Sequence, residues 1–113
     1  MTLRITEKQI TRAVVEHWRM LGLPGTLVAS IPNEGAKGQY GLRKGLPDLM
    51  VISPSLPVGF MEIKTATGTL KPDQAEFAQL CTARGIPHVV TFGRDDPIRA
   101  LEDWGVIRKG ARL

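Results

Sequence analysis

The sequence has 113 residues, of which 42% are hydrophobic and 23% are charged, close to the averages of soluble globular proteins. This composition argues against a disordered chain, a collagen-like repeat and a coiled coil, and the length predicts one domain over residues 1–113. The net charge of +4 is compatible with a polyanionic partner but is common among proteins that have none.

Neither a membrane segment nor a signal peptide is apparent in the sequence. No apolar run approaches the roughly 20 residues that span a bilayer, and the first dozen residues alternate charged with aliphatic side chains. We therefore expect a soluble cytoplasmic protein without a membrane partner. The single cysteine, Cys81, cannot form an internal disulfide, and with only two histidines in the chain a histidine/cysteine zinc site is poorly supplied.

Helix signals and then strand signals mark the first half of the chain. Thr6 followed by Gln9 fits a capping box, and apolar residues recur at helical spacing until Gly22, which predicts a first helix. TLVASIP, residues 26–32, is short and β-favouring and predicts a first strand. A glycine-rich basic loop follows.

Two further strands and two helices complete the predicted order. DLMVIS (48–53) and GFMEIK (59–64) predict strands joined by so short a link that we expect them to be antiparallel. A second helix is expected from Pro72 to a cap at Gly85. HVVTF then predicts a fourth strand, and DDPIRALEDWG predicts a short last helix.

Charged residues stand where an apolar strand is expected. Asp48 opens the second strand, and Glu62 and Lys64 lie within the third. Strand alternation places Glu62 and Lys64 on one face, about 6 to 7 Å apart, with Ile63 on the other face. In an antiparallel pair, Asp48 at the start of one strand approaches Glu62 late in the next. Two carboxylates so placed repel unless a cation lies between them, and magnesium prefers such oxygen ligands. The alternative is the solvated face of an edge strand, with Asp48 as a turn residue.

The segments around these charges resemble a known family. GLPDLMVI followed by GFMEIKTATGTLKPDQ is similar to the PD-(D/E)XK nucleases, and more closely to their VRR-NUC branch. In that branch a G-x-P-D strand precedes an E-x-K strand and a helix that opens with a glutamine. The chain departs from the family at Lys71, where a serine or threonine would cap that helix. The resemblance implies an α/β restriction-endonuclease-like core, with a mixed four-stranded sheet flanked by helices in the order αβββαβ plus a short C-terminal helix.

The same resemblance implies a metal site. Asp48 and Glu62 would bind Mg²⁺ or Mn²⁺ with the backbone carbonyl of Ile63. Glu16 in the first helix would hold the ion through water or orient a second ion, and the alternative for Glu16 is a solvent-facing helix glutamate. Such an ion lowers the pKa of bound water from about 15.7 towards neutrality.

Further roles concern the nucleophile and the substrate. Lys64 would position the attacking water and stabilise charge on the phosphate, and Gln74 would point toward Lys64 or that water. In the basic loop, Lys37, Arg43 and Lys44 suit phosphate contacts, although a solvated connection has the same composition.

The resemblance thus implies a metal-dependent DNA endonuclease, with branched or junction DNA as a candidate substrate. A homodimer and a bacterial or phage origin are expected from the resemblance. No P-loop pattern is present, so no nucleotide cofactor is expected. The alternatives are a non-catalytic nucleic-acid-binding module and a small interaction protein in which the motif is fortuitous.

Overall fold

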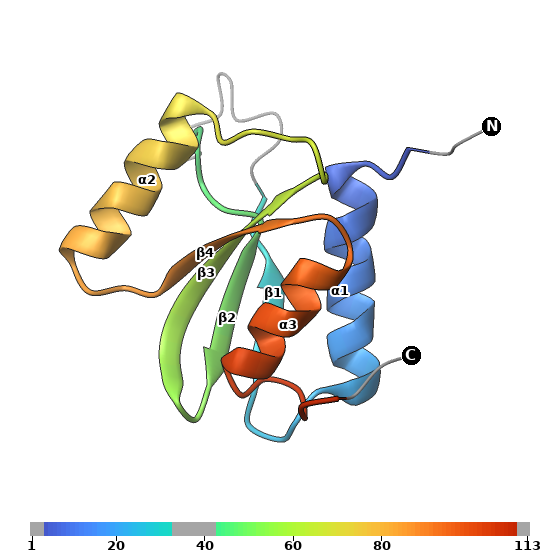
Figure 1. Cartoon of the computed structure of the whole chain (residues 1–113). Coiled ribbons are helices and arrows are strands. Elements are labelled where there is room, and N and C mark those ends of the chain that lie inside the picture. Colours follow the sequence, from blue (N-terminus) through green and yellow to red (C-terminus); the bar gives the residue numbers. More distant parts are fainter. Residues whose placement is uncertain (1–3, 33–42, 111–113) are drawn as a thin grey trace.

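The computed structural model describes residues 4–32 and 43–110 of the chain (Figure 1). Its elements follow the predicted order of helix, three strands, helix, strand and helix. They are α1 (Glu7–Leu21), β1 (Leu27–Ser30), β2 (Leu49–Ser53), β3 (Leu56–Lys64), α2 (Pro72–Ala83), β4 (His88–Phe92) and α3 (Asp95–Asp103).

The four strands form one mixed sheet in chain order, β1-β2-β3-β4. Each of the first two pairs is antiparallel, and β4 runs parallel to β3. The predicted α/β class, the mixed sheet and the antiparallel link between the second and third strands are therefore confirmed.

The third strand begins three residues earlier than the sequence predicted, at Leu56 and not at Gly59. The added segment contains Pro57, and proline cannot donate a ladder hydrogen bond. It is accommodated here because β4 pairs with β3 only from Phe60 onward, so Pro57 has no β4 residue beside it.

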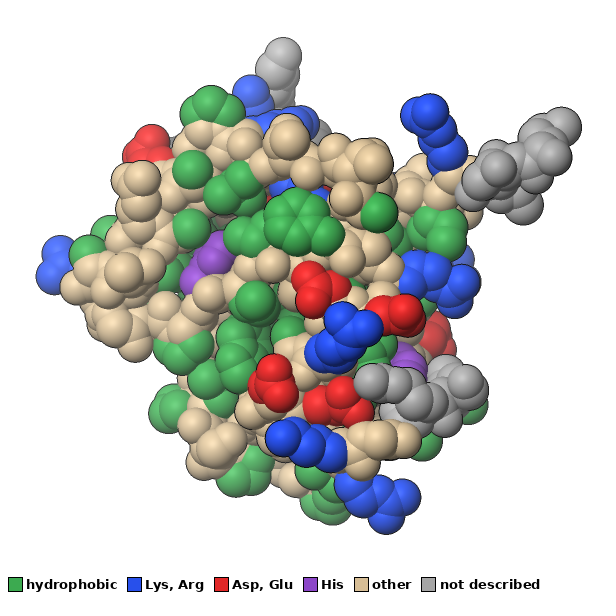
Figure 2. Space-filling model, viewed as in Figure 1, with side chains coloured by type: hydrophobic (Ala, Val, Ile, Leu, Met, Phe, Trp, Pro, Cys, Tyr) green, Lys and Arg blue, Asp and Glu red, His purple; other side chains and the backbone are tan. Residues whose placement is uncertain are grey.

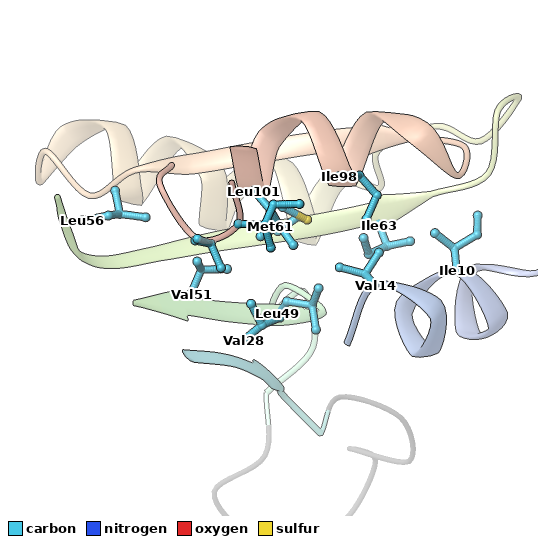
Figure 3. Packing of buried hydrophobic residues seen from close by; sticks show 12 residues of the cluster. Ile10, Val14, Val28, Leu49, Val51, Leu56, Met61, Ile63, Ile98 and Leu101 are labelled. Carbon is cyan, nitrogen blue, oxygen red and sulfur yellow. The ribbon is translucent and has the colours of Figure 1, made fainter. Parts of the chain in front are cut away.

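The hydrophobic core lies between one face of the sheet and the helices α1 and α3 (Figure 3). Met61 and Ile63 of β3 are fully buried and face Ile98 from α3 and Val14 from α1 in the same cluster. The first helix starts as predicted, since Thr6 and Gln9 exchange both hydrogen bonds of a capping box.

The remaining helix, α2, packs on the opposite side of β3. Phe60 alternates with Met61 along the strand and therefore points away from the core. Its ring meets Phe77 of α2 edge to face, with 5.4 Å between the ring centroids. Glu62 and Lys64 share the side of Phe60, so the charged residues of β3 lie on its α2 side.

Within residues 4–32 and 43–110, no helix is long and apolar enough to cross a membrane.

Gly45 fixes the approach of the chain to β2. Its φ angle is +88°, and a Cβ at this position would lie 2.6 Å from the backbone oxygen of Asp73 in the first turn of α2. Gly85 also has a positive φ, of +70°, but a Cβ there would meet nothing within 4 Å.

We expect Gly45→Ala to lower the unfolding free energy more than Gly85→Ala. Both variants place an L-residue in a left-handed conformation at about 1 to 2 kcal/mol, but only Gly45→Ala also forces two backbone segments apart. Urea denaturation of the two variants measures the difference. Equal losses would show that the contact with α2 is not tight.

Candidate active site

The site residues gather where the starts of α1, β2 and α2 meet the end of β3, all at one end of the sheet (Figure 1). Leu49 of β2 is paired with Met61 of β3, so the next position in the register sets Asp48 beside Glu62. Asp48 Oδ2 accepts a hydrogen bond from the backbone N–H of Ile63 at 2.6 Å. The register therefore brings the first carboxylate against the strand that carries the second.

Glu62 and Lys64 are both buried, each with 2% of its surface exposed. Their strand is an inner strand, with β2 on one side and β4 on the other. The interpretation of this pair as the solvated face of an edge strand is therefore wrong. A buried carboxylate and ammonium need polar partners, because an uncompensated charge in the interior costs several kcal/mol.

The Glu62 carboxyl is strongly perturbed. Burial is the largest cause and raises its pKa from 4.5 to about 9, assisted by the hydrogen bond and negative charge of Asp48 and by the charge of Glu7. The ammonium of Lys64 opposes this rise in the pKa. Without a cation, the Asp48–Glu62 pair therefore retains a proton at neutral pH.

Gln74 connects the start of α2 to this pair. Its Oε1 accepts from the backbone N–H of Lys71 at 2.9 Å, and its Nε2 donates to Glu62 Oε2 at 3.2 Å. Gln74 was expected to reach Lys64 or a water molecule, and the contact it makes is with Glu62. Gln74 thereby satisfies the N–H of Lys71 at the start of α2, while the Lys71 side chain makes no capping hydrogen bond. On the other side, the Thr91 hydroxyl donates to the carbonyl oxygen of Glu62 at 3.2 Å.

Glu7, which the sequence analysis overlooked, lies beside Lys64. Its Oε2 is 3.9 Å from Lys64 Nζ, and 42% of the Glu7 side chain is exposed. The residue directly follows the N-cap Thr6, so it looked like an acidic residue that only favours the positive end of the helix dipole. The position of Glu7 at the very start of α1 was the sequence feature that could have pointed to its role at the site.

Glu16 does not join this group. It pairs with Arg19 at 3.2 Å, and 54% of its side chain is exposed. Nine positions separate Glu7 from Glu16, and at about 100° per residue they lie on opposite sides of α1. Among residues 4–32 and 43–110, no three acidic, histidine or cysteine side chains are grouped closely enough to hold a metal ion. The candidate metal ligands that the structure brings together are thus Asp48 and Glu62.

The predicted DNA-contacting residues are only partly described. Arg43 is exposed and lies 3.4 Å from Glu76 of α2, which ties the end of the loop to that helix. Lys44 is exposed next to it. Lys37 lies outside the described residues.

The raised pKa of Glu62 predicts a pH-dependent stability. The folded protein retains this proton up to about pH 9, whereas the unfolded chain loses it near pH 4.5. Between these values the folded state binds more protons, so the unfolding free energy falls as the pH rises. In EDTA, Glu62→Gln should remove that decline, and urea denaturation at pH 5, 7 and 9 would measure it. Parallel pH profiles for the variant and the natural chain would contradict the assignment.

Comparisons with known proteins agree with this architecture. No family model matches the sequence, and no curated protein matches it either. A solved structure described as a VRR_NUC domain is 26% identical, with a TM-score of 0.62 over 88% of this chain and 97% of the other. Another, described as a VRR_NUC domain protein, is 20% identical and shares the fold with a TM-score of 0.74, over 98% of this chain and 99% of the other. The chain therefore shares its fold with VRR-NUC domains, the family that its sequence motifs resemble.

Proposed function

We propose that this chain is a nuclease of the VRR-NUC family, a metal-dependent DNA endonuclease that hydrolyses phosphodiester bonds in the manner of the PD-(D/E)XK enzymes. The observation that carries the proposal is the contact between Asp48, directly before β2, and Glu62 of the buried strand β3, which also carries Lys64. Burial of so much charge is costly for a purely structural purpose, and perturbed groups of this kind cluster at functional sites.

The carboxylate pair fits a hard divalent cation. Asp48 and Glu62 would hold Mg²⁺ or Mn²⁺, together with the carbonyl of Ile63, because such ions take oxygen ligands and commonly bind only one or two protein carboxylates. Burial first, and then the hydrogen bond and the negative charge of Asp48, raise the pKa of Glu62, and a bound cation would offset these effects by favouring the charged carboxylate. When bound, the ion would supply charge stabilisation at the phosphate and lower the pKa of a bound water.

The neighbouring side chains orient this pair and bind the substrate. Gln74 holds one oxygen of Glu62, and the Ile63 N–H holds one oxygen of Asp48. The two carboxyl groups also share a hydrogen bond, which a bound cation would replace. Lys64 would donate to a phosphate oxygen or to the attacking water, and Glu7 would orient the Lys64 ammonium. Lys37, Arg43 and Lys44 would contact the flanking phosphates.

The finer parts of this function stay predictions. They are preference for branched or junction DNA, a homodimer that acts on both strands, a bacterial or phage origin and a cytoplasmic location. A dimer is reasonable on physical grounds, since a domain of this size presents a short binding surface.

We expect cleavage of plasmid and branched DNA in Mg²⁺ or Mn²⁺, and none in EDTA. Asp48→Asn and Lys64→Ala should each lower the cleavage rate by at least about 100-fold, since the first removes a charge that would hold the metal ion and the second removes one that would act on the reacting phosphate. Gel assays measure the rate, and circular dichroism checks that the variants fold.

Asp103→Asn and Lys109→Ala are the matched controls, because both side chains are exposed and lie outside the site. They should cleave at the rate of the natural chain. DNA binding that EDTA does not change, without cleavage of any substrate, would refute the nuclease and favour a non-catalytic binding module.

The two glutamates of α1 give a second prediction. Glu7→Gln should lower the cleavage rate more than Glu16→Gln, because Glu7 lies 3.9 Å from Lys64 whereas Glu16 pairs with Arg19. Rates measured over a range of Mg²⁺ concentrations would separate an effect on metal affinity from one on the reaction. A larger loss in Glu16→Gln would return the metal role to that residue.

A further inference from the structure

A groove of about 830 Å³ lies along the outer side of α1. Residues of the first helix form one wall, and residues 30–32, the end of β1 and the two residues after it, form the other. Asp48 also lines the groove, and its backbone oxygen accepts a hydrogen bond from Ile31 of that second wall. The groove is therefore continuous with the carboxylate pair and forms an open approach to it.

Basic side chains form a straight stripe along the helical wall. Lys8, Arg12 and Arg19 all line the groove and are exposed. At about 100° per residue they fall within roughly 40° of one another around the helix axis. The sequence alone did not predict a role for this stripe, because basic residues are common on the polar side of an amphipathic helix.

The acidic residues of the groove are arranged differently. Glu7 lies at the start of α1 beside Lys64, and Asp48 belongs to the carboxylate pair, so both lie at the candidate active site. Glu16 lies on the far rim of the stripe and is paired with Arg19. The groove thus has an acidic end at the site and a basic wall leading away from it.

We propose that this groove binds the backbone of one DNA strand and leads it to Asp48, an inference that rests on the proposed nuclease function. From Lys8 to Arg19 the helix rises about 16 Å. The phosphates of one DNA strand are spaced about 3.4 Å apart along the axis of a duplex, so the stripe matches the length of about five phosphates. Opposite charge and the continuity with Asp48 favour a polyphosphate strand over an apolar partner. Contacts of this kind position the substrate without reading its sequence.

The test compares two double variants that remove the same charge. Arg12→Gln/Arg19→Gln changes the groove, and Arg99→Gln/Arg108→Gln changes exposed residues on and beyond α3. The surface over α3 is a suitable control, because acidic and basic side chains are intermixed there (Figure 2). Fluorescence anisotropy with a labelled 20-nucleotide single strand and a 20-base-pair duplex, in EDTA, measures binding without cleavage.

The groove double variant should bind the single strand roughly 10- to 30-fold more weakly at 0.1 M salt, and the slope of log affinity against log salt should fall by about 1.4, which is two phosphate contacts. The control double variant should lose less than about threefold. If both double variants lose DNA affinity equally, the attraction is general electrostatics and the groove proposal is overturned. The same holds if the groove double variant loses as much affinity for poly-glutamate as for DNA.

A cleavage assay with Mn²⁺ distinguishes the two proposals. If the natural chain cleaves DNA and only the groove double variant loses DNA binding, both the nuclease function and the groove proposal are supported. If the natural chain cleaves no substrate, the nuclease function is refuted, whereas the groove is overturned only by the binding measurements.

Discussion

The structure depends on one pairing of strands, which sets Asp48 against Glu62 at the end of a sheet. The antiparallel register of β2 and β3 fixes this contact, and Leu49 and Met61, both fully buried, hold that register. A slip of one residue would turn every side chain of β3 to the other face and would send Glu62 into the apolar core. The energy of the core therefore maintains a contact that is electrostatically unfavourable by itself.

The surrounding elements supply the polar partners that make this burial tolerable. Gln74 donates from the first turn of α2, the backbone of β3 donates to Asp48, and Thr91 donates to the carbonyl of Glu62. The same glutamine caps its own helix, so the position of α2 and the orientation of Glu62 are coupled. Gly45 permits the chain before Asp48 to approach the start of α2, so the segment that carries Asp48 lies close to the helix that carries Gln74.

Charge on this domain is divided by position. The acidic side chains of Glu7, Asp48 and Glu62 come together at one end of the sheet, while the adjacent wall of α1 carries a basic stripe. The net charge of +4 conceals this separation, because a sum over the chain does not record where the charges lie. A site that gathers a cation and a polyanion requires both signs within a short distance.

The sequence by itself determined the order of the elements, the strand faces and the pairing of P-D with E-x-K. These features are local or follow from the two-residue period of a strand, so Asp48, Glu62 and Lys64 could be brought together from their spacing. Only the tertiary structure decided that β3 is an inner strand, that Gln74 binds Glu62 and that Glu7 is the glutamate of α1 beside Lys64. Helical periodicity separates the faces of α1 but does not say which of its ends reaches the sheet, since that depends on how the helix crosses strands distant in sequence.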